Sequence, residues 1–168
     1  MTEGAWVTDL KVIENLAGRN EEDNQKFGTF LKTQDDPKKI DTLVKFISQN
    51  VAAGIDCKKC ANCCKSLTVA VNHPDMEKLA TALDLSTNEF KTQFMNRDLQ
   101  GQTVFKRRPC SFLKSNLCSV YENRPSTCRT YPHLETGNFI PRLGNVLSNL
   151  KVCPIAYNTF ELLKLNFE

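Results

Sequence analysis

The N-terminal third of the chain shows one strong amphipathic pattern. Between residues 40 and 51, apolar positions recur three or four residues apart, which is the spacing of one face of an α-helix. Asp36-Pro37 precedes this stretch and Gly54 follows it. Because proline suits the first turn of a helix and glycine suits its end, we expect one helix from Pro37 to just before Gly54.

A weaker pattern of the same kind precedes this helix. The residues spaced for a helix are Trp6, Leu10, Ile13 and Leu16. Residues 20–25 indicate either a loop or the opening of another helix. Since this part of the chain also lacks cysteine, we expect residues 1–52 to form an N-terminal helical arm or scaffold.

Three further helices are expected in the rest of the chain, residues 53–168. Pro74 and Pro154 each precede apolar residues at helical spacing, which places each proline in a first turn. Between them, Ser86-x-x-Glu89 has the spacing of a capping box, in which each side chain bonds the backbone of the other residue. The apolar residues of these helices are Met76, Leu79, Ala80, Leu83, Phe90, Phe94, Met95, Ala156, Phe160 and Leu163.

Short strands complete the pattern. Residues 67–71 are expected to form one strand, because they are rich in Val and Thr. Two apolar segments, 110–113 and 117–121, flank a polar turn and predict a small hairpin. We therefore predict the α+β class: a small, mainly helical domain with a short β-hairpin.

Composition narrows the class of protein. Hydrophobic residues make up 40% of the 168 residues, enough for a modest core, and no apolar run approaches the roughly 18 residues that span a bilayer. Residues 1–6 lack the basic start and the continuous apolar stretch of a secretory signal. We therefore expect a cytoplasmic protein with no membrane partner. In a reducing compartment its thiols would serve metal binding or redox chemistry rather than structural disulfides.

The formal net charge of +3 is a poor indication of a nucleic-acid partner. It counts every cysteine as neutral, whereas metal-bound cysteines are thiolates. Two four-thiolate sites, each holding a divalent ion or a cluster core, would bring the formal charge to about −1. The basic run Lys106-Arg107-Arg108 also lacks the flanking aromatic residues that would stack on bases, so no nucleic-acid partner is expected.

The candidate chemistry lies in eight cysteines. Four form the run Cys57-x-x-Cys60-x-x-Cys63-Cys64. Two residues between thiolates allow one tight turn to direct both sulfurs to a single metal. The remaining four are Cys110, Cys118, Cys128 and Cys153. Eight thiols suffice for two four-thiolate sites, and thiol redox chemistry or disulfide formation is the lesser alternative.

Iron is the first prediction for the metal. Three thiols at this spacing match three ligands of a ferredoxin-type [4Fe–4S] cluster, whose further ligand is a cysteine followed by proline, as in Cys153-Pro154. Zinc in closed four-cysteine sites is the alternative, because the same thiolates suit it. The first ligand set expected is Cys57, Cys60, Cys63 and Cys153, and a second is Cys64, Cys110, Cys118 and Cys128.

The adjacent pair Cys63-Cys64 bears on this division. Neighbouring side chains are expected to diverge, so both would not ligate one small ion comfortably. We expect either that one serves each of two sites or that one stays a free redox thiol.

A second motif covers residues 108–132 and reads RPCxFL, then LCSVYExRPxxCRxYP. Together with the opening cysteine run, it closely resembles the YkgJ-type cysteine-cluster family, the CxxCxxCC zinc- or iron-chelating domain. The resemblance extends from Cys57 to Cys153-Pro154 and includes the helix start at Pro74-Asp75. It implies a metal-chelating module in which all eight cysteines occupy positions that the family uses.

Polar residues follow the last cysteine of this motif. Arg129, Tyr131 and His133 are expected to contact the metal ligands from outside and to orient them, as residues beside ligands commonly do. The other histidine, His73, stands at a predicted helix start, where an N-cap or a surface position is expected.

Three functions are compatible with these features. The first is an iron–sulfur or iron protein in redox sensing, electron transfer or the maturation of a partner protein. The second is a zinc-binding module for protein interaction, and the third is an iron-dependent modifying enzyme, which needs an open coordination position. Catalytic motifs such as G-x-S-x-G, H-E-x-x-H and the P-loop are missing, so no catalytic residue is assigned.

Overall fold

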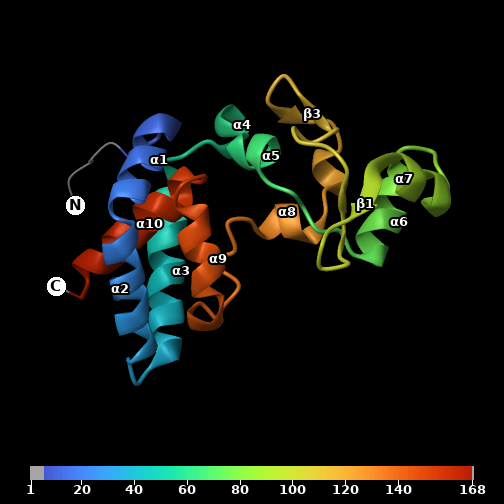
Figure 1. The fold of residues 1–168 in the computed structure, drawn as a ribbon. Coiled ribbons are helices and arrows are strands. Elements are labelled where there is room, and N and C mark those ends of the chain that lie inside the picture. The colour runs from blue at the N-terminus through green and yellow to red at the C-terminus, as the bar shows by residue number, and fades with distance from the viewer. Residues whose placement is uncertain (1–5, 168) are drawn as a thin grey trace. The chain divides into compact units, whose positions relative to one another are not determined.

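The computed structural model describes residues 6–167 (Figure 1). Residues 1–5 and residue 168 lie outside the described residues. The segment expected to lack a secretory signal therefore falls almost entirely outside them. The chain forms two compact units. The helical unit comprises Met1–Asp56 and Pro132–Glu168, and the cysteine unit comprises Cys57–Tyr131. The boundary expected between residues 52 and 53 stays a prediction.

The helical unit is a bundle in which α3 packs against α10, and α1, α2 and α9 complete the packing. Its elements are α1 (Leu10–Arg19), α2 (Glu21–Lys32), α3 (Pro37–Ala53), the 3₁₀ turn η2 (Ile140–Arg142), α9 (Leu143–Asn149) and α10 (Pro154–Leu165). Among residues 6–167, no helix is both long and apolar enough to cross a membrane.

The two strongest helix predictions in this unit are confirmed. Pro37 lies in the first turn of α3, the Asp36 carboxylate accepts from the backbone N–H of Lys39 at 3.0 Å, and Gly54 ends the helix. The predicted apolar residues of α10, Ala156, Phe160 and Leu163, are buried. Residues 20–25 open a helix rather than forming a loop, since α2 begins at Glu21.

Trp6 does not belong to the helix predicted around it. Helix α1 begins only at Leu10 and is capped by Asp9. The Asp9 carboxylate accepts a hydrogen bond from the backbone N–H of Lys11 at 2.8 Å. The Trp6 indole instead lies against Gly54, where a Cβ atom would stand only 2.7 Å from the indole Cδ1. Glycine at this position therefore allows the close approach of Trp6 to the end of α3.

The cysteine unit is built from short elements around its own core. The elements are α4 (Cys57–Cys60), α5 (Asn62–Ser66), α6 (His73–Ala82), α7 (Thr87–Phe94), β1 (Met95–Arg97), β2 (Thr103–Phe105), β3 (Leu113–Lys114), β4 (Leu117–Cys118), the 3₁₀ turn η1 (Tyr121–Asn123) and α8 (Ser126–Thr130). Its core residues are Val71, Met76, Leu79, Ala80, Phe90, Met95, Phe105, Phe112 and Val120. The Phe112 ring contacts the rings of both Phe90 and Phe105 in this core.

Helix starts in this unit follow the sequence signals. The capping box at Ser86 and Glu89 is confirmed: the Ser86 hydroxyl accepts from the Glu89 backbone N–H at 3.3 Å, and Glu89 accepts from the Ser86 N–H at 2.8 Å. At α6, the cap is Asn72, whose side chain accepts from the backbone N–H of Asp75 at 2.8 Å. His73 is therefore a surface residue in the first turn and not the cap.

Two small antiparallel sheets complete the unit, and the mainly helical α+β prediction is confirmed. The predicted hairpin is β3–β4, shorter than expected, and its two turn residues Ser115 and Asn116 have φ values of 49° and 63°. Positive φ at both positions is the signature of a type I′ turn. The β1–β2 hairpin was not predicted, and of the expected strand only Ala70 forms a bridge, with Val104 of β2.

Candidate metal centre

Seven of the eight cysteines belong to the cysteine unit, and Cys153 belongs to the helical unit. Cys57 is exposed, Cys153 is buried, and the other six are half-buried. Among the described residues, none of the eight forms a disulfide. A ligand set that joins Cys153 to Cys57, Cys60 and Cys63 stays a prediction, because it would connect the two units.

The opening cysteine run folds into two consecutive helical turns. Cys57 and Cys60 are the end residues of α4, and the following residue, Ala61, has a left-handed φ of 50° that separates α4 from α5. Cys63 and Cys64 lie in α5, with their sulfurs 4.0 Å apart. These adjacent side chains do not diverge as expected, because both sulfurs lie within hydrogen-bonding distance.

The β3–β4 hairpin positions Cys110 and Cys118. The Cys110 backbone N–H donates to the carbonyl of Cys64 at 2.8 Å, which joins the start of this segment to α5. Cys118 ends β4, directly opposite Leu113 of β3. The turn itself is anchored to α4, since the Asn116 amide donates to the Lys59 carbonyl at 3.3 Å.

Backbone amides already point at two of these sulfurs. The backbone N–H groups of Phe112 and Leu113 donate hydrogen bonds to the Cys110 sulfur, and the N–H of Val120 donates to the Cys118 sulfur. Each of these hydrogen bonds favours the thiolate form. Phe112 and Val120 are themselves buried in the core of the cysteine unit. The core therefore fixes the amides that surround these sulfurs.

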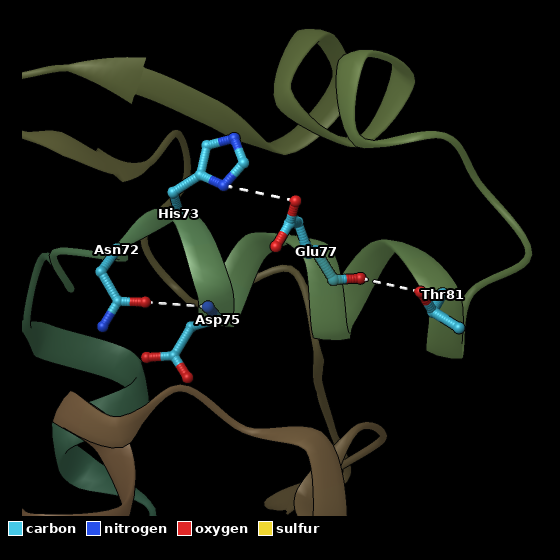
Figure 2. Close-up of polar contacts among 5 residues, drawn as sticks. All are labelled: Asn72, His73, Asp75, Glu77 and Thr81. Carbon is cyan, nitrogen blue, oxygen red and sulfur yellow. Dashed lines mark hydrogen bonds and ion pairs between the residues drawn. The ribbon is translucent and has the colours of Figure 1, made fainter.

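Cys128 lies in α8, and a carboxylate from another helix caps α8. One oxygen of Asp75, Oδ2, accepts from both the backbone N–H of Ser126 at 2.8 Å and the Ser126 hydroxyl at 2.7 Å. In Figure 2, the Asp75 carboxylate points away from the side of α6 that holds His73 and Glu77. The His73 imidazole Nδ1 lies 3.5 Å from the Glu77 carboxylate. Asp75 thus acts as the N-terminal cap that α8 lacks in its own sequence.

Four of the thiols influence one another electrostatically. Burial, and after it negative charge on Cys64, Cys110 and Cys118, raises the pKa of Cys128 to about 12. Burial is also the main cause that raises the pKa of Cys110 and Cys118, and charge on Cys64 adds to both. Cys64 moves in the opposite direction, to about 7, because Cys63 donates a hydrogen bond to its sulfur and Lys65 lies near. We call these four residues the coupled thiols.

Arg124 supplies positive charge to the same group. Its guanidinium lowers the pKa of Cys118 and of Cys128, in opposition to burial. The guanidinium centre lies 3.7 Å from the centroid of the Tyr121 ring, and the Lys58 ammonium lies 5.0 Å from that centroid. Tyr121 therefore holds two cations beside the cysteine-bearing segments.

The chemistry of the coupled thiols fits a thiolate-bound metal. Four sulfurs is the number that a closed zinc site or a [4Fe–4S] cluster requires, and amide donors to sulfur are typical of such sites. Among residues 6–167, no three His, Cys, Asp or Glu side chains are grouped closely enough to hold a metal ion as they stand. The structure therefore shows the thiols as neighbours within one unit and not as a closed coordination sphere.

The residues expected around the ligands lie in different places. Arg129 is exposed on α8, where its guanidinium donates to the Arg124 carbonyl at 3.0 Å, and Tyr131 is the last residue of the cysteine unit. His133 belongs to the helical unit, where burial and the charge of Arg142 lower its pKa. Contact of any of the three with a metal ligand stays a prediction.

Comparison with known proteins supports the same chemistry. Neither the search of curated proteins nor the search of solved structures gave a match. A family model named CxxCxxCC, described as a "Putative zinc- or iron-chelating domain", matches residues 56–154, more than half of the chain. This match confirms the resemblance seen in the cysteine motifs. The chain therefore belongs to the CxxCxxCC family, whose described property is the chelation of zinc or iron.

Proposed function

We propose that this protein holds a [4Fe–4S] cluster or iron centre through cysteine thiolates and uses it in redox sensing or electron transfer. The observation that carries the proposal is the set of coupled thiols, in which charge on Cys64 raises the pKa of three other half-buried cysteines of the same unit. The ligands in this proposal are Cys64, Cys110, Cys118 and Cys128. Binding would draw their sulfurs together. A bound cluster would supply one-electron transfer.

The surroundings of these thiols support an anionic centre. A [4Fe–4S]²⁺ core with four thiolates carries about −2 in total charge. Lys65 lowers the pKa of Cys64, and Arg124 lowers the pKa of Cys118 and Cys128. Both cations favour the thiolate form that a metal needs.

A second set of thiols remains available. Cys57, Cys60 and Cys63 keep the C-x-x-C-x-x-C spacing of a ferredoxin-type cluster, and Cys153 is the further ligand proposed for them. A chain with two clusters would use all eight cysteines. The metal stoichiometry therefore distinguishes one site from two.

Zinc is the second candidate, because the family to which the chain belongs is described as binding either metal. In that case the coupled thiols would form a closed four-cysteine site that stabilises a module for protein interaction. Such a module would be colourless and would carry no redox activity.

The deciding experiment is anaerobic purification followed by metal and acid-labile sulfide analysis with a visible spectrum. We expect iron and sulfide together, with absorbance near about 400 nm that bleaches on reduction. Zinc alone at one or two ions per chain would overturn the cluster proposal and support the zinc module. No bound metal after anaerobic reconstitution with either metal would overturn both.

Variants test which cysteines hold the metal. Cys128→Ser is expected to abolish the centre at the coupled thiols, whereas Ser119→Ala, next to Cys118, is the matched control and should keep its full metal content. If Cys128→Ser retained wild-type metal content and spectrum, the proposed ligand set would be wrong. Cys153→Ser should reduce the metal content only if the second set also binds.

A further inference from the structure

A hollow in the cysteine unit lies apart from the residues that the metal centre would use. Its volume is about 550 Å³, and residues of α7, of the β1–β2 hairpin and of the segment just after β2 form its walls. This volume is within the range of about 300–1,000 Å³ that is usual for small-molecule sites.

One wall is a single face of α7. Asn88, Lys91 and Thr92 lie on α7, and Met95 follows at the start of β1. Lys91, Thr92 and Met95 come three, four and seven residues after Asn88, which is the spacing of one helical face. The Lys91 ammonium has no hydrogen-bond or ion-pair partner among the described residues. Amide, ammonium and hydroxyl groups therefore line this wall, and Met95 gives it an apolar floor.

The opposite wall is one face of the β1–β2 hairpin. Arg97 of β1 pairs directly with Thr103 of β2, so the two side chains share a face of the hairpin. The Arg97 guanidinium donates through Nη1 to the Gly101 carbonyl at 2.7 Å, which holds it in place and leaves its other N–H groups available. The ammonium of Lys106, just after β2, donates a hydrogen bond to the Thr92 carbonyl, which joins the two walls.

The charge on this surface is of one sign. Three cations, Lys91, Arg97 and Lys106, line the hollow, and no carboxylate of the described residues is among the residues that line it. The acidic residues of the same elements are engaged elsewhere. Glu89 bonds the backbone of Ser86, and Asp98 accepts from the backbone N–H groups of Gln100 and Gln102 at 2.9 and 2.8 Å.

From this arrangement we infer that the hollow is a binding site for a small phosphorylated molecule. Arginine binds phosphate through parallel N–H bonds, lysine adds a point charge, and threonine and asparagine supply neutral donors. The volume exceeds what a single phosphate group fills, so the ligand carries an organic part or a second phosphate. Aromatic rings are not among the lining residues, so the site lacks the stacking surfaces that bind single-stranded nucleic acid.

The test is a calorimetric titration of the metal-loaded full chain with inorganic pyrophosphate. A second titration uses a nucleoside triphosphate. The variants are Arg97→Gln and Lys91→Gln. Lys91 is exposed and has no partner among the described residues, so its variant leaves the fold intact. Arg107→Gln is the matched control, because it removes the same charge ten residues from Arg97 and does not line the hollow.

Saturable binding of pyrophosphate to the wild type is expected, with affinity reduced about tenfold in Arg97→Gln and in Lys91→Gln. Arg107→Gln should stay within about twofold of the wild type. Tighter binding of the triphosphate than of pyrophosphate would identify a nucleotide as the ligand. Three outcomes would each overturn the inference. They are an equal loss of affinity in all three variants, a binding affinity that Arg97→Gln leaves unchanged, and no binding of pyrophosphate at low millimolar concentration. The inference would also be overturned if single-stranded RNA bound more tightly than pyrophosphate and if Arg107→Gln weakened RNA binding as much as Arg97→Gln did.

Discussion

Eight chemically identical side chains acquire different properties from their immediate neighbours. The Cys64 thiol receives a hydrogen bond from Cys63 and lies near a lysine, and its pKa falls to about 7. Cys128 is partly buried and lies near other thiols, and both causes raise its pKa to about 12. At neutral pH without metal, Cys64 is therefore about half thiolate, whereas Cys128 holds its proton.

Alkylation of the reduced, metal-free protein should show this difference. We expect iodoacetamide to modify Cys64 faster than Cys110, Cys118 or Cys128 at pH 7, with a rate that rises through a midpoint near pH 7 because the thiolate is the nucleophile. Peptide mass spectrometry over time measures each rate. Lys65→Gln should move the Cys64 midpoint upward. Equal rates for the four cysteines would contradict the assigned environment.

A buried hydroxyl in the helical unit carries a second residue-scale prediction. Thr159 on α10 is 1% exposed, and its hydroxyl has no hydrogen-bond partner within residues 6–167. Because Thr159→Val replaces this hydroxyl with a methyl group of similar size, it should raise the free energy of unfolding by about 1 kcal/mol. Chemical denaturation measures the change. Thr42→Val, whose exposed hydroxyl bonds the Lys38 carbonyl, is the control and should give no gain.

At the residue scale, the sequence identified the thiols but not what surrounds them. Cysteine type and spacing are visible in one dimension, so the candidate ligands could all be named. The amides of Phe112 and Val120 that face two of the sulfurs depend on where the hairpin packs. Packing of this kind is a tertiary property, and no local pattern encodes it.

At the scale of elements, the sequence predicted contacts between residues close together in the chain and missed contacts between distant residues. The capping box of α7 joins residues three positions apart, and it was predicted from Ser86 and Glu89 alone. The cap of α8 joins Asp75 to Ser126, which are 51 positions apart. In the sequence, Asp75 is marked only as part of the Pro74-Asp75 pair that the family resemblance includes, and nothing there indicates a contact with Ser126. The β1–β2 hairpin escaped prediction because its strands are only three residues long and do not alternate clearly.

The Asp75 cap should control the helix that carries Cys128. Asp75→Ala removes both hydrogen bonds to Ser126, and loss of an N-cap costs about 1 kcal/mol, so the cysteine unit should be destabilised by about that amount. Metal affinity, measured by competition with a chelator, should fall with it. Asp75→Asn keeps an accepting oxygen and should restore most of both properties.

Glu77→Ala is the matched control for this experiment. Glu77 lies on the same helix, and among the described residues its carboxylate contacts the exposed His73, an interaction worth little in water. We expect wild-type stability and metal affinity. If Glu77→Ala weakened metal binding as much as Asp75→Ala, the effect would belong to α6 as a whole and not to the cap.

At the scale of the whole molecule, the helical unit was the easier part to predict. Long amphipathic patterns specify α3 and α10, and burial of their apolar faces follows directly. The pairing of α3 with α10 joins residues more than a hundred positions apart, and a single sequence does not contain that information. The short α9, with few turns and few apolar residues, also escaped prediction.

Metal removal should affect the two units unequally. Binding energy at thiolate sites contributes to folding, so a chelator should lower amide protection in the core of the cysteine unit, at Phe90 and Phe112, as measured by hydrogen exchange. The middle of α3 should keep its protection. If Cys153 also binds metal, protection at the start of α10 will fall too. Unchanged protection in the cysteine unit would show that the fold does not depend on the metal.

The helical unit is built from two separate stretches of the chain, and this has a consequence for biosynthesis. Chains are made from the N-terminus, and domains generally fold as units while they emerge. The cysteine unit is one continuous stretch, Cys57–Tyr131, whereas the bundle needs α9 and α10, which are translated later. Seven cysteines therefore leave the ribosome before the bundle can close, and the eighth arrives with its last helix. The order of translation thus allows the coupled thiols to receive their metal before Cys153 and the following helix, α10, have been made.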